Sequence, residues 1–246
     1  MKNQHNVPAR EILRFMQDCR PAMLDLLRRM AESESPSDVP EAQAGITAII
    51  ANELEQRGLE VEQIPGKKSG GMIYARAAGG PGAPAQLILG HYDTVWPIGT
   101  LESMPFRQDG DTVHGPGVYD MKGGVAQAML AFDALNHFGL ECEVTPHVFL
   151  NSDEEIGSRE SRPWIEKLAP KMERVFVLEP SLGPAGQLKT ARKGIGRYTI
   201  SVSGEAAHAG LDPGAGASAI LELSHVIQEL FALNDLDRGV TVNVGT

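Results

Sequence analysis

The chain has 246 residues and a mass of 26.4 kDa, enough to bury a large core in one or two domains. Hydrophobic residues make up 42% of it and charged residues 22%, as in ordinary globular proteins, and no low-complexity segment suggests disorder. The 32 acidic residues against 22 basic ones give a formal charge of −10, which argues against a general binder of nucleic acid or of anionic membranes.

The ends and the cysteines of the chain narrow its cellular context. The N-terminal segment "MKNQHNVPAR" lacks the apolar core of a signal peptide, and no stretch approaches the roughly 18 apolar residues of a membrane span. Cys19 and Cys142 are too few and too far apart for a disulfide framework or a zinc ribbon. We therefore expect a cytoplasmic protein that binds neither membranes nor nucleic acid.

Hydrophobic periodicity predicts three helices in the first sixty residues. Apolar residues recur at helical spacing from Ile12 to Met30, and Pro21 is expected to divide this stretch into two helices. A third helix is expected from about Pro40, with Gly58 as its end, because a capped entry precedes it and glycine favours helix termination.

Strands alternate with helices through the middle of the chain. Strand-like runs are expected at 60–64, 72–77, 86–89, 145–150 and 174–178. The Asp109–Gly110 pair predicts a hairpin turn, and a helix is expected over 121–138, ending at Gly139. This alternation indicates an α/β fold in which helices and a sheet form layers.

The last sixty residues have a pattern of their own. After "KTARKG" at 189–194, a strand-like run at 196–204, an apolar-striped helix at 217–233 and a second strand-like run at 239–245 predict a β-α-β unit. This unit is expected to begin a second, smaller domain, with the boundary between Arg192 and Lys193. Because the chain stops straight after a predicted strand, we also expect it to be a piece of a longer protein.

Potential metal ligands follow the ends of three separate apolar runs. "LILGHYD" ends in His91 and Asp93, "VFLNSDEE" ends in Glu154 and Glu155, and "VFVLEP" contains Glu179. In open α/β sheets, sites form outside the carboxyl ends of the strands, so these residues are expected to converge there. Asp120, in "GPGVYDMKGG" at a helix entry, is a fourth contribution.

Each of these residues also has an interpretation without a metal. A histidine after a strand is usually packed or solvated, Asp120 could simply cap a helix, and the glutamates could be surface charge. Together, however, one imidazole and several carboxylates would repel strongly without a cation, whereas two divalent ions would make them a hydrolase centre. A dinucleotide-binding loop at "GPGVYDMKGG" is disfavoured, since Asp120 stands where the motif needs glycine and would repel a pyrophosphate.

Five motifs, in order along the chain, resemble one known family. "GHYDTV", "GPGVYDMKGG", "NSDEEIGS", "VLEPS" and "SGEAAHAGLDP" are similar to those of the co-catalytic di-zinc amidohydrolases and exopeptidases. That family includes glutamate carboxypeptidase, acetylornithine deacetylase, succinyl-diaminopimelate desuccinylase and aminoacylase. The resemblance runs from about Ser33 to Thr246 and is strongest to the glutamate carboxypeptidase branch.

The resemblance implies roles for particular residues. His91 and Glu179 would bind one zinc ion, Glu155 the other, and Asp120 would bridge the two. Asp93 would accept a hydrogen bond from the second nitrogen of His91 and so fix its tautomer. Glu154 would be the general base, taking a proton from the attacking water and passing it to the leaving amine.

The end of the chain would supply further residues of the site. The resemblance implies that His208 lies in a lid domain, reaches the partner subunit's active site and helps to stabilise the oxyanion. Asn243, Arg192 and Lys193 fall near family positions that hold the substrate carboxylate. The implied fold is a three-layer, zinc-peptidase-like catalytic domain over 1–192 and a partial ferredoxin-like lid over 193–246, through which the protein would form a homodimer.

The implied activity is hydrolysis of an amide bond next to a free carboxylate, in a small molecule or short peptide. Two zinc ions per full-length subunit would serve it, with cobalt or manganese as alternatives. The family's second zinc takes a final histidine from a later segment than this chain contains, so the chain alone is expected to bind that ion poorly and to hydrolyse little. Two other functions stay open: an N-acyl amino acid deacylase or desuccinylase, and an inactive, metal-stabilised binding or dimerisation protein.

Overall fold

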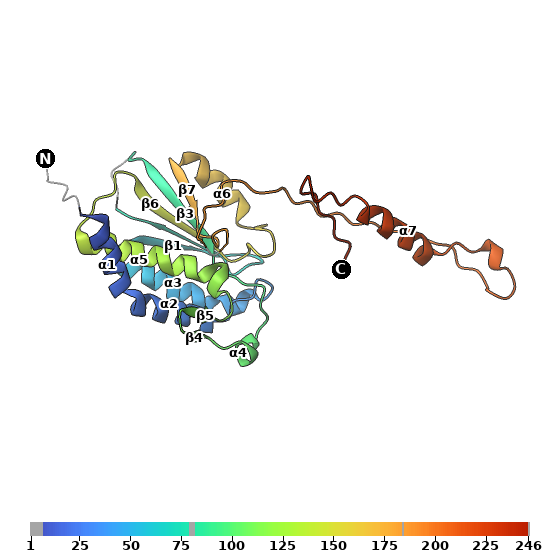
Figure 1. The fold of residues 1–246 in the computed structure, drawn as a ribbon, viewed down its shortest axis with the longest axis horizontal. Coiled ribbons are helices and arrows are strands. Elements are labelled where there is room, and N and C mark those ends of the chain that lie inside the picture. The colour runs from blue at the N-terminus through green and yellow to red at the C-terminus, as the bar shows by residue number, and fades with distance from the viewer. Residues whose placement is uncertain (1–6, 79–81, 184, 246) are drawn as a thin grey trace. The chain divides into compact units, whose positions relative to one another are not determined.

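The computed structural model describes residues 7–78, 82–183 and 185–245. The chain divides into two compact units, Met1–Leu188 and Lys189–Thr246. Both helices and strands occur in the first unit, which has a mixed sheet, so the α/β class is confirmed (Figure 1). Within the described residues, no helix has the length and apolar character needed to cross a membrane.

A five-stranded sheet with the order β1-β2-β6-β3-β7 forms the centre of the first unit. The strands are β1 (Glu60–Ile64), β2 (Met72–Arg76), β3 (Ala85–His91), β6 (Thr145–Asn151) and β7 (Arg174–Val177). β3 lies between β6 and β7 and is parallel to both, whereas β2 is antiparallel to β1 and β6. The carboxyl ends of β3, β6 and β7 therefore lie at one edge of the sheet.

Alternating side chains give the sheet two buried faces. Ile73 of β2 and Val148 and Leu150 of β6 pack against the helices of one layer, and Met72 and Phe149 pack on the opposite face. The first layer contains α2 (Arg20–Glu32), α3 (Ala44–Gln56) and α5 (Gly123–Phe138), and the second contains α6 (Arg162–Leu168). The result is three layers, with helices on both faces of the sheet (Figure 1).

The helices largely follow the sequence-based expectations. α1 (Ala9–Asp18) ends just before α2, in whose first turn Pro21 lies, and a 3₁₀ turn, η1 (Pro40–Gln43), leads into α3. Gly58 and Gly139 follow α3 and α5 with φ of 83° and 59°, a conformation that glycine adopts without steric cost. The hairpin pairs β4 (Arg107–Asp109) with β5 (Thr112–His114).

Several short elements of the first unit were not predicted from the sequence. α4 (Thr100–Ser103) is a single turn. α6 and η3 (Ala169–Lys171) lie between β6 and β7 in the sequence, and together they cover one face of the sheet. Such short segments show little helical periodicity, and α6 carries a proline in its first turn.

The second unit contains one helix and few backbone pairings. α7 (Ala219–Phe231) is capped by Ser218 and agrees with the expected helix, and η4 (Pro213–Ala215) is a short turn. The strands expected at 196–204 and 239–245 were wrong: the described residues of this unit form only isolated bridges. Alternating apolar and polar residues can give a strand one apolar face. They do not supply the neighbouring strand whose hydrogen bonds form a sheet.

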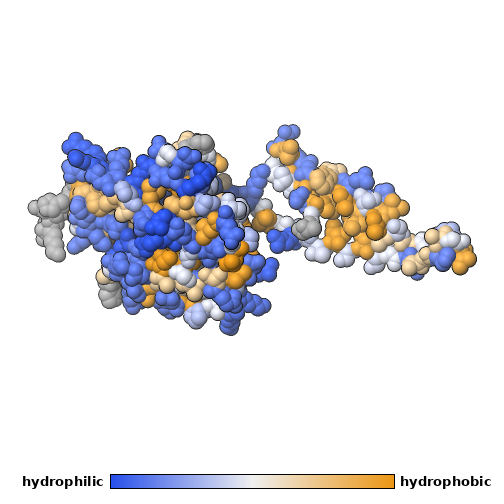
Figure 2. All heavy atoms as spheres, turned by 90° about the horizontal axis from the view of Figure 1, so that it is seen from below, coloured by the Kyte–Doolittle hydropathy of each residue, from blue (hydrophilic) through white to orange (hydrophobic). Residues whose placement is uncertain are grey.

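Hydrophobic side chains lie exposed on this second unit. Ile195, Tyr198 and Leu236 are 99%, 89% and 78% exposed, and Figure 2 shows apolar residues gathered on the surface of this part of the chain. Monomeric proteins rarely leave so much contiguous apolar surface in water. The ferredoxin-like lid and the boundary at 192/193 stay predictions.

Candidate metal centre

The three ligand-bearing segments meet at the carboxyl edge of the sheet. His91 is the last residue of β3 and is paired with Asn151, the last residue of β6, while Leu89 is paired with Val177 at the end of β7. Asp93, the Glu154–Glu155 pair and Glu179 follow these ends within a few residues. The expected convergence at one sheet edge is confirmed.

The imidazole of His91 is surrounded by carboxylates. Its Nε2 atom lies 3.2 Å from Asp120 Oδ1, 3.7 Å from Glu179 Oε1 and 3.9 Å from Glu154 Oε2. His91, Asp120 and Glu179 each offer one ligand atom, and these atoms lie within 4.8 Å of one another. Since His91 is 1% exposed and Asp120 53%, the cluster is open on one side. The cluster could therefore hold a cation while Asp120 faces the solvent.

Asp120 lies before a helix, in an irregular turn, η2 (Val118–Lys122). Its backbone is extended, with φ −118° and ψ 101°, and the Asp120–Met121 peptide bond is cis. The regular helix α5 starts only at Gly123, so Asp120 is too far from its first turn to cap it. The side chain of Asp120 instead contacts His91. Gly117, just before this turn, lets the backbone pass close to Thr94, because a Cβ atom at position 117 would lie 2.6 Å from the methyl group of Thr94.

Asp93 connects the end of β3 to the acidic loop after β6. Its Oδ1 atom lies 3.3 Å from Nδ1 of His91 and accepts a hydrogen bond from the backbone N–H of Glu154. Its Oδ2 atom accepts hydrogen bonds from the hydroxyl of Ser37 at 2.6 Å and from the N–H of Glu155 at 3.2 Å. A carboxylate on the far nitrogen of a histidine fixes which nitrogen faces the metal. The same carboxylate here also holds the backbone of two other candidate residues.

The three consecutive acids of the loop have different environments. Asp153 is buried, and its Oδ2 accepts hydrogen bonds from the N–H groups of Glu160 and Ser161. Glu154 is 45% exposed beside His91, and Glu155 is half-buried. Among the described residues, Glu155 lies outside the compact group of His91, Asp120 and Glu179, as a ligand to a second ion would.

Burial and charge shift two pKa values in this cluster. Burial would lower the pKa of His91, but the carboxylates of Asp93, Glu154 and Glu179 outweigh it and raise the pKa to about 9. Burial raises the pKa of Glu155 to about 7, opposed by His91 and reinforced by Asp120 and the other nearby acids. Without a bound cation, the cluster thus holds protons to reduce its own repulsion.

These shifts predict proton release when a metal ion binds. With a pKa of about 9, His91 is protonated at pH 7.5, whereas a metal ligand must be the neutral imidazole. Binding should therefore release about one proton from His91, and metal affinity should rise with pH up to about 9. Titration calorimetry in buffers of different ionisation enthalpy measures this proton count. A count of zero at pH 7.5 would contradict a protonated His91 in the metal-free protein.

The donor set fits a divalent metal ion. One imidazole nitrogen and carboxylate oxygens, within a few ångströms and open to solvent, suit zinc, with cobalt and manganese as chemically similar alternatives. If an ion is bound, His91, Asp120 and Glu179 would hold it, and Asp120 with Glu155 would be left to hold a second one.

The remaining sequence-based candidates belong to the second unit. His208 is exposed, and its Nδ1 atom accepts hydrogen bonds from the N–H groups of Gly210 and Leu211 at 3.1 and 3.2 Å. The proton of a neutral ring is therefore on Nε2, available for donation. Arg192, Lys193 and Asn243 are exposed. The roles of all four stay predictions.

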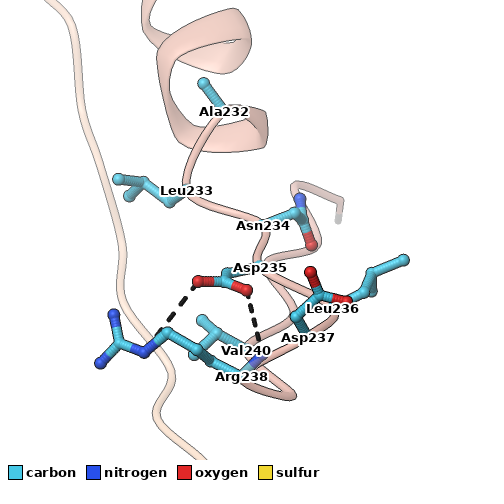
Figure 3. A pocket seen from close by; sticks show the side chains of 8 residues that line it. All are labelled: Ala232, Leu233, Asn234, Asp235, Leu236, Asp237, Arg238 and Val240. Carbon is cyan, nitrogen blue, oxygen red and sulfur yellow. Dashed lines mark hydrogen bonds and ion pairs between the residues drawn. The ribbon is translucent and has the colours of Figure 1, made fainter.

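A hollow in the second unit lacks comparable chemistry. It lies at the turn after α7, where Asp235 accepts a hydrogen bond from the N–H of Arg238 and forms a 4.0 Å ion pair with its guanidinium (Figure 3). The other lining residues are mostly leucine, valine, alanine and asparagine. We assign it no function.

Two residues of the site were not found from the sequence. Lys122 is fully buried, its Nζ atom donates to the carbonyl of Ser33 at 3.4 Å, and burial lowers its pKa to about 7 against the opposing charge of Asp93. Ser37 reaches Asp93 from a loop 56 residues away. The lysine beside Asp120 at the helix entry was a usable signal, but no local pattern marks Ser37.

Replacing Ser37 by Ala should weaken the support of Asp93. The change removes a 2.6 Å hydrogen bond to a buried carboxylate, which is worth about 1.5–3 kcal/mol. We expect the free energy of unfolding to fall by that amount in urea titration, and metal affinity to fall by about tenfold. Ser103→Ala, at an exposed position, is the matched control. Equal effects of the two changes would contradict this role of Ser37.

Comparison with known proteins places this geometry in a family. The model of Peptidase family M20/M25/M40 matches residues 87–243. Carboxypeptidase G2 of Pseudomonas sp. (strain RS-16) is 30% identical over 230 residues, which cover 92% of this chain and 55% of that protein. Succinyl-diaminopimelate desuccinylase of Xylella fastidiosa (strain M12) is 31% identical over 190 residues, covering 70% of this chain and 48% of the relative.

A solved structure agrees with the sequence comparisons. The dipeptidase Dug1p of Saccharomyces cerevisiae superimposes with a TM-score of 0.65 at 17% identity, covering 95% of this chain and 56% of that one. This likeness supports the fold. The chain spans about half the length of the curated relatives that it matches. Since the family model covers more than half of the chain, including the metal-centre segments from His91 to Glu179, the protein belongs to Peptidase family M20/M25/M40.

Proposed function

We propose that the protein is a metal-dependent hydrolase that cleaves an amide bond next to a free carboxylate. The single observation that carries this proposal is the cluster of His91, Asp120 and Glu179 at the sheet edge, with Glu154 beside it. Family membership and the likeness to Carboxypeptidase G2 support a peptidase of the carboxypeptidase type. The expected substrates are short peptides or N-acyl amino acids.

The family resemblance supports the ligand roles, and the cluster of His91, Asp120 and Glu179 is compatible with them. His91 and Glu179 would hold one zinc ion, Glu155 would hold a second, and Asp120 would serve both. Asp93 keeps the proton of His91 on the nitrogen that faces away from the metal, because its Oδ1 atom lies 3.3 Å from Nδ1. Bound metal ions would supply Lewis-acid chemistry, lowering the pKa of the attacking water and polarising the scissile carbonyl.

The residues of the chain then move the protons. Glu154 takes a proton from the attacking water on a carboxylate oxygen and later delivers it to the nitrogen of the leaving amine. Its 45% exposure leaves room for a substrate, and its backbone N–H, bonded to Asp93, keeps it beside the cluster. His208, with its proton on Nε2, would donate a hydrogen bond to the oxyanion from a lid domain, in a homodimer. Arg192, Lys193 and Asn243 would hold the substrate carboxylate.

Two alternative functions remain to be distinguished. An N-acyl amino acid deacylase or desuccinylase would use the same centre, and the likeness to succinyl-diaminopimelate desuccinylase favours including it. An inactive metal-stabilised protein would have no use for Glu154, a carboxylate beside the cluster but outside its compact ligand group.

A hydrolysis screen tests the proposal. The full-length protein, loaded with zinc, cobalt or manganese, is incubated with N-acyl amino acids and dipeptides, and the released amine is measured. We expect release from substrates with a free carboxylate next to the scissile amide, with preferred glutamate derivatives indicating the carboxypeptidase type. Preference for N-succinyl substrates would indicate the desuccinylase, and metal binding without any release would indicate the inactive protein.

A further inference from the structure

The loop that carries Glu154 and Glu155 is attached to a second loop, which has no part in the proposed chemistry. This second loop, Gly66–Gly71, connects β1 to β2. Because Met72 at the start of β2 is paired with Asn151 at the end of β6, the two loops leave the sheet at the same edge. We call residues 152–161 the acidic loop and residues 66–71 the glycine loop.

One side chain of the acidic loop makes most of this attachment. The Oε1 atom of Glu160 accepts a hydrogen bond from the N–H of Lys67 at 2.7 Å. Its Oε2 atom accepts from the N–H groups of Lys68 and Ser69, at 3.2 and 3.0 Å, and from the Ser69 hydroxyl at 2.7 Å. Four donors on one carboxylate form a strong, charge-assisted set.

The glycine loop can act as a rigid support because it is tightly packed. A Cβ atom on Gly66 would lie 2.2 Å from the carbonyl oxygen of Ser69, and one on Gly70 would lie 2.1 Å from Oε1 of Gln43. Gln43 accepts the N–H of Gly70 at 2.8 Å and donates to the carbonyl of Ser152 at 3.1 Å. Buried Gln43 therefore joins the glycine loop to the first residue of the acidic loop.

The acidic loop is thus held near both ends, with the candidate catalytic residues between. Ser152, at its start, donates to the carbonyl of Gly71 at 2.7 Å, and Glu160, near its end, takes the four donors above. Between them, the backbone N–H groups of Glu154 and Glu155 donate to Asp93, at 3.3 and 3.2 Å. Repulsion among the carboxylates of the acidic loop favours its movement away from Asp93. Fixed loop ends are therefore needed to keep the long hydrogen bonds from Glu154 and Glu155 to Asp93.

We propose that Glu160 is a positioning residue, which keeps Glu154 and Glu155 at the metal centre by fastening the acidic loop to the backbone of the glycine loop. The proposal extends the proposed function, since it concerns how the assigned base and ligand are held. Burial would raise the pKa of Glu160, but the hydrogen bonds from Ser69 and the loop amides outweigh it and lower the pKa, in agreement with an ionised carboxylate.

Hydrogen exchange tests the positioning directly, without metal or activity. In Glu160→Gln the donors face an amide that has lost the charge and one acceptor, so amide exchange over 152–161 should be at least about tenfold faster than in the wild type. Exchange in β3, residues 85–91, should stay within about twofold. Glu166→Gln, an exposed acid on α6, is the matched control, and Ser69→Ala should show a smaller effect because the three backbone donors remain.

Kinetics tests the consequence for catalysis. For any substrate that the wild type hydrolyses, Glu160→Gln should lower kcat by about tenfold or more and change KM by less than about twofold. Unchanged exchange over 152–161, or faster exchange throughout the unit together with a lower melting temperature, would overturn the proposal. If the wild type hydrolyses nothing, the proposed function fails, whereas the exchange result still decides the role of Glu160.

Discussion

Replacing Glu154 by Gln should lower kcat by about a thousandfold while the metal content of the protein stays unchanged. Gln has the same shape and keeps the backbone hydrogen bond to Asp93, but it cannot accept the proton of the attacking water. Glu154 borders His91 at 3.9 Å and is outside the compact group of ligand atoms, so its loss should leave the ion in place. Steady-state kinetics and elemental analysis on the same preparation measure both quantities.

The control for this variant is Glu143→Gln, which changes an exposed acid just before β6. Its kcat should be within about twofold of the wild type, since surface substitutions away from special features have small effects. Near-normal kcat in Glu154→Gln with metal present would refute the base assignment. A joint loss of metal and activity would instead make Glu154 a ligand.

Replacing His91 by Ala should weaken metal binding by more than about a hundredfold and abolish hydrolysis. Even outer partners of metal ligands are worth about 10–100-fold in affinity, and His91 is the one nitrogen donor in the described cluster. Without its imidazole, Asp120, Glu154 and Glu179 would face one another with their repulsion unrelieved. Calorimetric titration with zinc measures the affinity, and thermal unfolding checks that the variant is folded.

The matched control is His225→Ala, on the exposed face of α7. It should bind metal as the wild type does. If His91→Ala is folded and still binds zinc within about threefold of the wild-type affinity, the cluster at the sheet edge is not the metal centre.

The convergence of the metal centre was predictable from the sequence for a simple reason. Apolar runs of strand length each stopped at a chemically active residue, and parallel strands bring their carboxyl ends to one edge. His91, Glu154 and Glu179 could therefore be expected near one another. The β2–β6 pairing and the position of β3 between β6 and β7 were not predictable, since no local pattern specifies strand order.

The supports of the site could not be read from the sequence. Glu160 takes its hydrogen bonds from residues more than 90 positions away, and three of its four donors are backbone amides, which every residue except proline carries. Ser37 and Gln43 form hydrogen bonds across 56 and 109 positions. Asp120 could be placed at a helix entry, but its extended backbone, which directs it to His91, depends on packing around Gly117.

The second unit shows where alternation alone misleads. The runs at 196–204 and 239–245 have the period of strands, yet the described residues there are not strands, and Ile195 and Tyr198 remain almost fully exposed. Helix α7 was predictable because a helix satisfies its backbone hydrogen bonds within itself. A strand needs a neighbour, which the periodicity of one segment cannot supply.

Removal and return of the metal tests the central claim most directly. The rate of amine release from an N-acyl amino acid is measured before chelation, after chelation and dialysis, and after zinc is added back. A metal-dependent hydrolase should lose its activity with the metal and regain it on reconstitution, whereas His91→Ala should stay inactive. Hydrolysis that continues at the same rate in the chelated, metal-depleted protein would contradict the assignment.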